Sequence, residues 1–205
     1  MRKFIITSLV VGLMVGISTI ASANLLTNPG FETGSNIPWV RIGYHAFSVN
    51  PGAKYAGTYG LEMILSTSGD GWGGQYQNKP ASEGDIFTFS AMSNTLNLNS
   101  YANSTLQIAY FDVSDPGYSA TPIAAYNTAS VTGLDWTELS ITSYPAPTGT
   151  QAVRFVLVSY ADPASGSGSS YFDDANATAI PEPSTMLLLG TGLFGLALPL
   201  LRRKK

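Results

Sequence analysis

The chain contains no cysteine and a single histidine among its 205 residues. The absence of cysteine excludes disulfides, thiol nucleophiles, iron–sulfur centres, Cys-ligated zinc and a lipid-modified N-terminal cysteine. One histidine excludes most zinc enzymes and makes a Ser-His-Asp triad hard to build. Charge is also scarce, because Asp, Glu, Lys and Arg make up only 11% of the residues, less than half of the usual share. Coiled coils and long surface helices need more charge than this, so the composition argues against both.

The few charged residues are unevenly distributed along the chain. Basic residues cluster at the two ends, whereas the central part, residues 24–180, holds twelve acidic residues against four basic ones. This central part therefore carries a net charge near −8, which repels phosphate backbones and makes nucleic acid a poor partner. A simpler explanation of the charge is solubility, which a net charge far from zero favours.

Residues 1–23 have the three parts of a secretory signal peptide. Two basic residues follow the initiator Met, residues 4–20 are uncharged and mostly apolar, and residues 21–23 read Ala-Ser-Ala, an A-x-A cleavage site. The mature chain is therefore expected to start at Asn24. The alternative is an uncleaved anchor helix, which the A-x-A site disfavours.

The C-terminal segment has the composition of a membrane anchor. Residues 184–201 carry no charge and are rich in Leu, Gly and Met, and as a helix they would span roughly 27 Å, enough for a bilayer core. Four basic residues, 202–205, follow directly. By the positive-inside rule this basic tail stays in the cytoplasm and the central body lies outside. The alternative is a buried core helix, which the terminal charges disfavour.

Pro181, Glu182 and Pro183 precede the anchor, and the two prolines impose an extended conformation on this stretch. The order of Pro-Glu-Pro, apolar helix and basic end resembles the PEP-CTERM sorting signal of Gram-negative bacteria. The resemblance covers residues 181–205 and implies recognition by an exosortase-type membrane protease, with processing near the motif. It also implies a transient anchor in the inner membrane, followed by delivery to the outer surface or the extracellular matrix.

The central body, residues 24–180, alternates runs of strand-forming residues with turns rich in Gly, Pro, Asn, Asp and Ser. Strands are expected at residues 44–50, 59–67, 72–77, 86–93, 105–112, 134–143, 152–159 and 171–178. Eight short strands in one domain of this length predict an all-β fold, an antiparallel jelly-roll β-sandwich. Such a domain can bury a core without disulfides.

Short motifs follow one another through this body, at residues 24–32, 39, 60–63, 84–90, 136–139 and 171–174. Their order resembles the galactose-binding-like jelly roll, specifically carbohydrate-binding modules of families 4, 9 and 22. In that family a structural calcium often joins the N-terminal loop to the final strand, and the matching ligands here are Glu32 and Asp173. Calcium prefers such oxygen donors. The alternative is that both carboxylates are solvated or accept hydrogen bonds from loop amides.

Sugar binding needs an aromatic face beside hydrogen-bonding groups. Residues 70–77, with the sequence DGWGGQYQ, offer both, because glycines leave Trp72 uncrowded and polar side chains follow it. We therefore expect Trp72, Gln75 and Tyr76 to contact a ligand. The alternative is that Trp72 caps the hydrophobic core.

These features predict an exported bacterial surface or matrix protein whose lectin-like domain binds polysaccharide, with exopolysaccharide as one expected partner. The alternative is a structural or adhesive matrix protein with the same fold and no sugar site. An enzyme is not expected, because no motif singles out the two carboxylates that a glycosidase needs. The calcium ion is the one cofactor that the resemblance implies.

Overall fold

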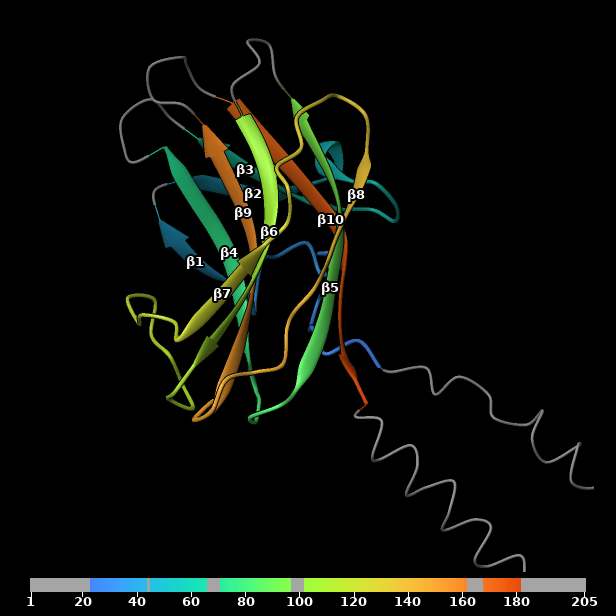
Figure 1. Cartoon of the computed structure of the whole chain (residues 1–205). Helices are drawn as coiled ribbons and strands as arrows, with labels where there is room; N and C mark the ends of the chain where they lie inside the picture. The colour runs from blue at the N-terminus through green and yellow to red at the C-terminus, as the bar shows by residue number, and fades with distance from the viewer. Residues whose placement is uncertain (1–22, 44, 66–70, 97–101, 162–167, 182–205) are drawn as a thin grey trace, which may run out of the picture.

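The computed structural model describes residues 23–43, 45–65, 71–96, 102–161 and 168–181. These residues form two antiparallel sheets that pack face to face, together with one 3-10 turn at Pro51–Ala53 (Figure 1). The predicted all-β sandwich is confirmed. The predicted anchor at 184–201, most of the signal segment, and two residues of the Pro-Glu-Pro motif, Glu182 and Pro183, lie outside the described residues. Among the helices of the described part of the chain, none is long and apolar enough to cross a bilayer.

Each sheet has five strands, and every strand pairs antiparallel with its neighbours. Sheet A has, in spatial order, the strands β1 (Val40–Gly43), β4 (Trp72–Pro80), β9 (Ala152–Ala161), β6 (Ala102–Phe111) and β7 (Ala124–Asn127). Sheet B has, in spatial order, the strands β2 (Ala46–Asn50), β3 (Gly60–Leu65), β10 (Gly168–Ile180), β5 (Ile86–Leu96) and β8 (Thr137–Thr142).

Two strands, β1 and β7, were not predicted from the sequence. Each has four residues and lies at an edge of sheet A. Four residues are too few for an alternation of apolar and polar positions to be recognised. They become strands because their backbone pairs with β4 and β6, which are long and well formed.

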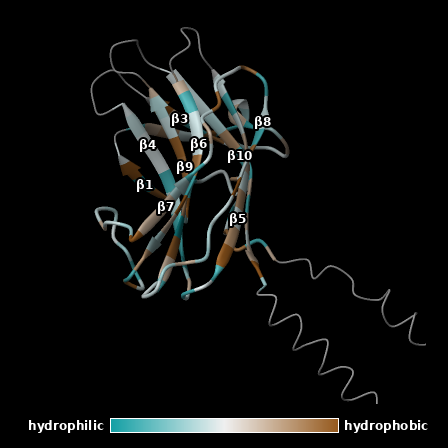
Figure 2. Cartoon of the chain, viewed as in Figure 1, coloured by the Kyte–Doolittle hydropathy of each residue, from teal (hydrophilic) through white to brown (hydrophobic). Residues whose placement is uncertain are grey.

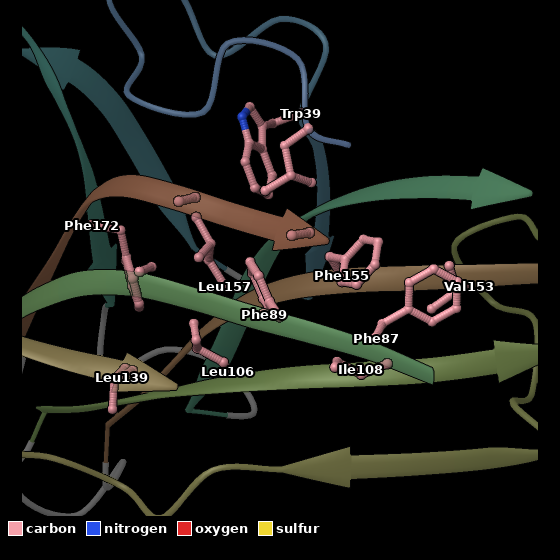
Figure 3. Packing of buried hydrophobic residues seen from close by; sticks show 14 of the residues in the cluster. Trp39, Phe87, Phe89, Leu106, Ile108, Leu139, Val153, Phe155, Leu157 and Phe172 are labelled. Atoms are coloured by element: carbon pink, nitrogen blue, oxygen red, sulfur yellow. The ribbon is translucent and has the colours of Figure 1, made fainter. Parts of the chain in front are cut away.

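Alternate residues of the central strands fill the space between the sheets with aromatic rings. Phe155 of sheet A packs against Phe87 and Phe89 of sheet B, with ring centroids 5.7 and 5.4 Å apart (Figure 3). Trp39 closes the layer at one side and is buried against Phe31, at 5.6 Å between ring centroids. Burying one such side chain contributes about 1.5–3 kcal/mol, so this layer accounts for the cohesion of the two sheets.

The two ends of the described chain lie side by side (Figure 1). The amide of Leu25 donates to the carbonyl of Ala177 in β10 at 2.8 Å, and the side-chain oxygen of Asn24 accepts from the amide of Ala177 at 3.0 Å. The first residue expected in the mature chain is thus bound to the last strand. That strand ends at Ile180, directly before Pro181.

Candidate functional site

The outer face of sheet A carries exposed aromatic side chains at one end. Trp72 is the first residue of β4 and pairs in register with Tyr160 of β9, so both side chains point away from the core. Trp72 is 37% exposed and Tyr160 is 42% exposed. Two neighbouring rings with free surface are a platform on which a flat, partly apolar ligand can stack.

A cavity of about 480 Å³ opens beside Trp72. It is lined by Arg41, Ile42, Gly43, Trp72, Tyr118 and Ser119. Tyr118 belongs to the loop between β6 and β7 and is 70% exposed, so aromatic side chains border the cavity from two elements. Gly43 has a φ of +76°, and a Cβ there would lie 2.9 Å from the carbonyl oxygen of Trp72. Glycine is therefore required for β1 to end so close to Trp72.

A second cavity, of about 460 Å³, follows the first along β4. Its lining includes Val40, Tyr76, Asn78, Lys79, Asp115 and Gly117. Because β1 and the loop of residues 112–123 border both cavities, we treat the two as one groove, called the β4 groove below. From Trp72 to Lys79 the strand rises roughly 23 Å, a length that accommodates several linked sugar rings. Figure 2 shows the hydrophobic β1 beside a β4 that is neutral to hydrophilic.

Arg154 of β9 holds the loop that forms one wall of the β4 groove. Its guanidinium donates to the carbonyls of Pro116 at 2.7 Å and Gly117 at 2.8 Å, and to the side-chain oxygen of Asn78 at 2.9 Å. The guanidinium carbon also lies 4.0 Å from the centre of the Tyr76 ring, a cation–π contact. Burial lowers the pKa of Arg154, but an arginine keeps its charge in proteins. A buried positive charge therefore lies under the groove.

The structure does not bring the three predicted ligand contacts to one site. Trp72 and Tyr76 lie on the outer face of sheet A, whereas Gln75 points between the sheets and is fully buried. The amide nitrogen of Gln75 lies 3.4 Å from Nε2 of His45. Residues at odd spacing in a strand face opposite sides, so Gln75 belongs to the interior. Tyr76 is buried beneath Arg154 and contributes to the lining of the second cavity.

His45 shares this interior position with Gln75. Burial, and to a smaller extent the positive charge of Arg41, lower the pKa of His45 from 6.5 to about 4. Its Nδ1 has no hydrogen-bond partner and lies against Gly73, where a side chain would clash with the imidazole ring. His45 is therefore a neutral, structural residue beneath β4.

Polar side chains that the sequence analysis did not single out extend the outer face of sheet A. Asn103, Thr105 and Gln107 of β6 alternate along that face and are half-buried. Asn103 pairs in register with Tyr160, and Gln107 donates to the side-chain oxygen of Asn127 at 3.0 Å. Hydroxyl and amide groups beside aromatic rings are the combination that sugar recognition requires. In the sequence, this outer face could have been recognised from the alternation along β9, which places Tyr160 on the same face as Arg154.

Glu32 and Asp173 meet on a different part of the molecule, at a loop of residues 54–59 outside sheet B. The two carboxylate oxygens of Glu32 accept from the amide of Thr58 at 3.0 and 2.9 Å. Oδ2 of Asp173 accepts from the amide of Tyr55 at 2.8 Å and from the following amide at 3.0 Å. The two carboxylates therefore join the N-terminal segment and β10 to one loop through backbone amides.

Backbone amides bind both carboxylates of this second site, which is the alternative to calcium that the sequence analysis gave. Asp173 is fully buried, and burial raises its pKa although three backbone amides bind it. Oδ1 of Asp173 and Oε2 of Glu32 each accept one hydrogen bond and so keep a lone pair. A Cβ on Gly30 would lie 3.4 Å from Oδ1 of Asp173 and 3.5 Å from Oδ1 of Asp174. Within the described residues, however, no three His, Asp or Glu side chains are close enough together to hold a metal.

Residues 179–205 match the PEP-CTERM protein-sorting motif. The chain carries a PEP-CTERM sorting signal. This confirms the resemblance drawn from Pro181, the glutamate after it and the apolar and basic segments that follow. No curated protein matches the chain.

Solved structures with the same fold include carbohydrate-binding modules. The module TmCBM61, in complex with β-1,4-galactotriose, matches with a TM-score of 0.54 and 18% identity over 78% of this chain and 100% of its own. A family 16 carbohydrate-binding module matches with a TM-score of 0.52 and 21% identity over 77% and 100% of the two chains. The CBM22-1 xylan-binding domain from Paenibacillus barcinonensis Xyn10C matches with a TM-score of 0.55 and 14% identity over 80% and 99%. The jelly-roll fold is therefore shared.

The PEP-CTERM motif begins inside the folded sandwich. Its first two residues, Ala179 and Ile180, still pair with Phe87 and Ile86 of β5. Pro181 follows without an intervening linker and is exposed. The sorting signal therefore starts at the end of a central strand of sheet B, beside the N-terminal segment that binds Ala177.

Proposed function

We propose that this protein is exported and sorted by an exosortase-type protease through its PEP-CTERM signal, and that its sandwich binds polysaccharide in the β4 groove. The observation that carries the binding part is the cavity of about 480 Å³ between Trp72 and Tyr118. It lies on a fold shared with carbohydrate-binding modules. The tail would hold the chain in the inner membrane before processing and delivery to the outer surface or matrix.

The side chains of the groove are complementary to the surface of a sugar chain. A pyranose presents an apolar C–H face, which stacks on aromatic rings, and a rim of hydroxyl groups, which need hydrogen-bonding partners. Trp72 and Tyr118 supply exposed rings, while Asn78 and Ser119 supply polar groups in the two cavities. An elongated groove that is open along its length suits a polymer better than a single sugar.

Binding without catalysis is the form of activity that the groove supports. Among the described residues that line its two cavities, Asp115 is the only carboxylate. Hydrolysis of a glycosidic bond uses two carboxyl groups on either side of the scissile bond. The described lining residues thus offer one carboxylate where that route uses two, which supports binding over cleavage.

We also propose that calcium binds between Glu32 and Asp173. When bound, it would neutralise the buried carboxylate of Asp173 and hold β10, the N-terminal segment and the 54–59 loop together. The role is structural, because this site lies outside sheet B and the β4 groove lies on sheet A. Its support is the free lone pair that each carboxylate keeps and the convergence of both acids on one loop.

Glycan binding is tested with the purified full-length protein in non-ionic detergent on an array of polysaccharides. Binding to at least one polymer, lost on substituting Trp72 by alanine, supports the proposal. The absence of binding to any polymer would favour the alternative, a structural or adhesive matrix protein with the same fold. Sorting is tested separately, by replacing Pro181, Glu182 and Pro183 with alanine and comparing membrane and outer-surface fractions. Unchanged delivery to the outer surface would refute the proposed sorting route.

A further inference from the structure

The last residues of β10 are held by different partners on the two sides of the strand. On one side β5 pairs with β10 to its end, with Ala179 opposite Phe87 and Ile180 opposite Ile86. On the other side β3 pairs with residues 168–172, and further along the N-terminal segment lies beside the strand (Figure 1). The second partner of the strand end therefore comes from the opposite end of the described chain.

Three N-terminal residues, Asn24, Leu25 and Pro29, bind the backbone of β10, and we call them the N-terminal clasp. The side chain of Asn24 accepts from the amide of Ala177 at 3.0 Å and donates to the carbonyl of Ala175 at 2.9 Å. The amide of Leu25 donates to the carbonyl of Ala177 at 2.8 Å. The amide of Ala175 donates to the carbonyl of Pro29 at 3.1 Å. The clasp thus binds both backbone groups of Ala175 and of Ala177.

The sorting signal begins just beyond the clasp. The bonds of the clasp reach as far as Ala177, which is fully buried, and the PEP-CTERM match starts two residues later, at Ala179. Ala179 is half-buried and Ile180 is 41% exposed. A strand end with little buried surface opens at a lower cost than the core of a sheet. The first two residues of the signal are therefore the part of β10 that opens most easily.

The motif continues β10 without a flexible linker. Pro181 follows Ile180 directly; its ring fixes its own φ and restricts the residue before it to an extended conformation. A partner that binds a peptide as an extended strand uses the backbone N–H and C=O groups of that peptide. A group that pairs with β5 cannot bind a second partner in the same way. The sandwich and a protease therefore compete for the residues next to Pro181.

We infer that Ala179 and Ile180 leave β5 when the sorting protease binds the signal, while the N-terminal clasp holds Ala177 and keeps the sandwich folded. The end of β10 is thus an opening segment, and its pairing with β5 limits the rate of processing. The inference rests on the proposed function, because it concerns the step at which an exosortase-type protease engages the tail. It adds to the motif two residues that the fold itself controls.

A linker of Gly-Ser-Gly-Ser inserted between Ile180 and Pro181 tests the inference without changing the sandwich. The linker offers the protease an unpaired segment before the motif, so β10 can stay paired with β5 during processing. The full-length protein and its variants are produced in a bacterium that carries an exosortase-type protease, and pulse-chase labelling follows the conversion of precursor to processed protein. We expect the linker to raise the rate of conversion by roughly three- to ten-fold.

Two matched glycine variants test the role of β5. Ile86→Gly weakens the strand opposite Ile180, because a glycine inside a strand costs backbone entropy and removes side-chain packing. Ile64→Gly is the control, because Ile64 pairs with Ser169 near the other end of β10. Both isoleucines neighbour a buried core residue in their strand and so face outward. We expect Ile86→Gly to speed processing by roughly two- to five-fold and Ile64→Gly to leave the rate unchanged.

Hydrogen exchange on the full-length protein in non-ionic detergent measures the opening without a protease. We expect the amide of Ile180 to exchange roughly ten-fold faster, or more, than the amide of Ala177. Asn24→Ala removes two bonds of the clasp and should speed exchange at Ala177. Exchange at Phe155, in the centre of sheet A, should stay unchanged in this variant.

The outcomes separate this inference from the proposed function. An unchanged or slower rate with the linker or with Ile86→Gly, or an equal increase with Ile64→Gly, would overturn the inference and leave the proposed sorting route standing. So would an Ile180 amide that exchanges as slowly as that of Ala177, or an Ala177 amide that Asn24→Ala does not affect. A wild-type precursor that is never processed, or processing that persists when the Pro-Glu-Pro motif is replaced by alanine, would overturn both.

Discussion

Replacing Arg154 by methionine should release the loop that walls the β4 groove. The guanidinium makes three hydrogen bonds, and it lies between the ring of Tyr76 at 4.0 Å and the ring of Phe111 at 4.6 Å. Methionine fills much of the same space without any donor. After the change Pro116 keeps one partner, the side-chain nitrogen of Asn78 at 3.0 Å. The carbonyl of Gly117 likewise keeps one partner, the amide of Ala120 at 3.1 Å, while the side-chain oxygen of Asn78 loses the donor that Arg154 provides.

The size of the effect follows from these contacts. A buried acceptor left without a partner costs about 1–3 kcal/mol, and the substitution leaves one such acceptor, the side-chain oxygen of Asn78. The cation–π contacts add up to about 2 kcal/mol, while removing the buried charge returns part of its desolvation cost. We therefore expect the free energy of unfolding to fall by about 2 kcal/mol. For a domain of this size that lowers the melting temperature by roughly 4–8 °C.

Two measurements check the reasoning. Thermal denaturation gives the stability, and hydrogen exchange gives the protection of the amides in residues 112–119. We expect faster exchange in this loop and unchanged exchange in β5. Arg154→Lys should behave almost like the methionine variant, because one ammonium group cannot reach acceptors in three directions. A lysine variant as stable as the wild type, or loop amides that exchange as slowly as before, would refute the assignment of Arg154 as the residue that holds the loop.

Three further predictions use other parts of the molecule. Trp72→Ala should weaken glycan binding by about 2 kcal/mol, roughly 30-fold, because the exposed 37% of the Trp72 surface is about 90 Å² that a sugar can cover. The control is Trp136→Ala, which changes a half-buried tryptophan beside sheet B and should leave the glycan affinity unchanged. Calcium added to chelator-treated protein should raise the melting temperature by roughly 5–10 °C at a hundred-fold excess over Kd, and Asp173→Asn should abolish the shift; no shift in the wild type would remove the calcium site. The pKa of His45 is lowered to about 4 in the folded state, so below pH 6.5 the unfolded chain takes up a proton that the folded state does not. Urea denaturation should therefore show full stability above pH 6.5 and a loss of about 2 kcal/mol by pH 4.5. His45→Gln should remove this pH dependence.

The central strands of both sheets were predictable because their apolar and polar residues alternate over long, regular stretches. In β9, Val153, Phe155 and Leu157 face the core while Arg154 faces outward, and this pattern is visible in the sequence. The edge strands β1 and β7 have no such pattern, because four residues form a strand only where a neighbour supplies hydrogen bonds. Local sequence thus determines the central strands and the edge strands of sheet B, and tertiary pairing determines the two short edge strands of sheet A.

In the candidate site, too, some features could be predicted from local sequence and others could not. The exposure of Trp72 followed from the glycines around it, and the inward direction of Gln75 could have been read from its odd spacing to Trp72. Tyr118 gave no local signal, because it reaches the groove only through a loop that Arg154 binds from another strand.

The position of the sorting signal determines how the groove is presented. Trp72 pairs with Tyr160 at the end of the sandwich where β10 begins, because Ser159 contacts Ser170 across the two sheets. From Gly168 to Ile180, β10 then runs roughly 40 Å to the opposite end, where the PEP-CTERM motif starts. A chain held by its C-terminal tail, before or after processing, therefore points the Trp72 end of the groove away from its attachment. Since the N-terminal segment also lies beside Ala177, both ends of the described chain lie at the end of the sandwich opposite Trp72.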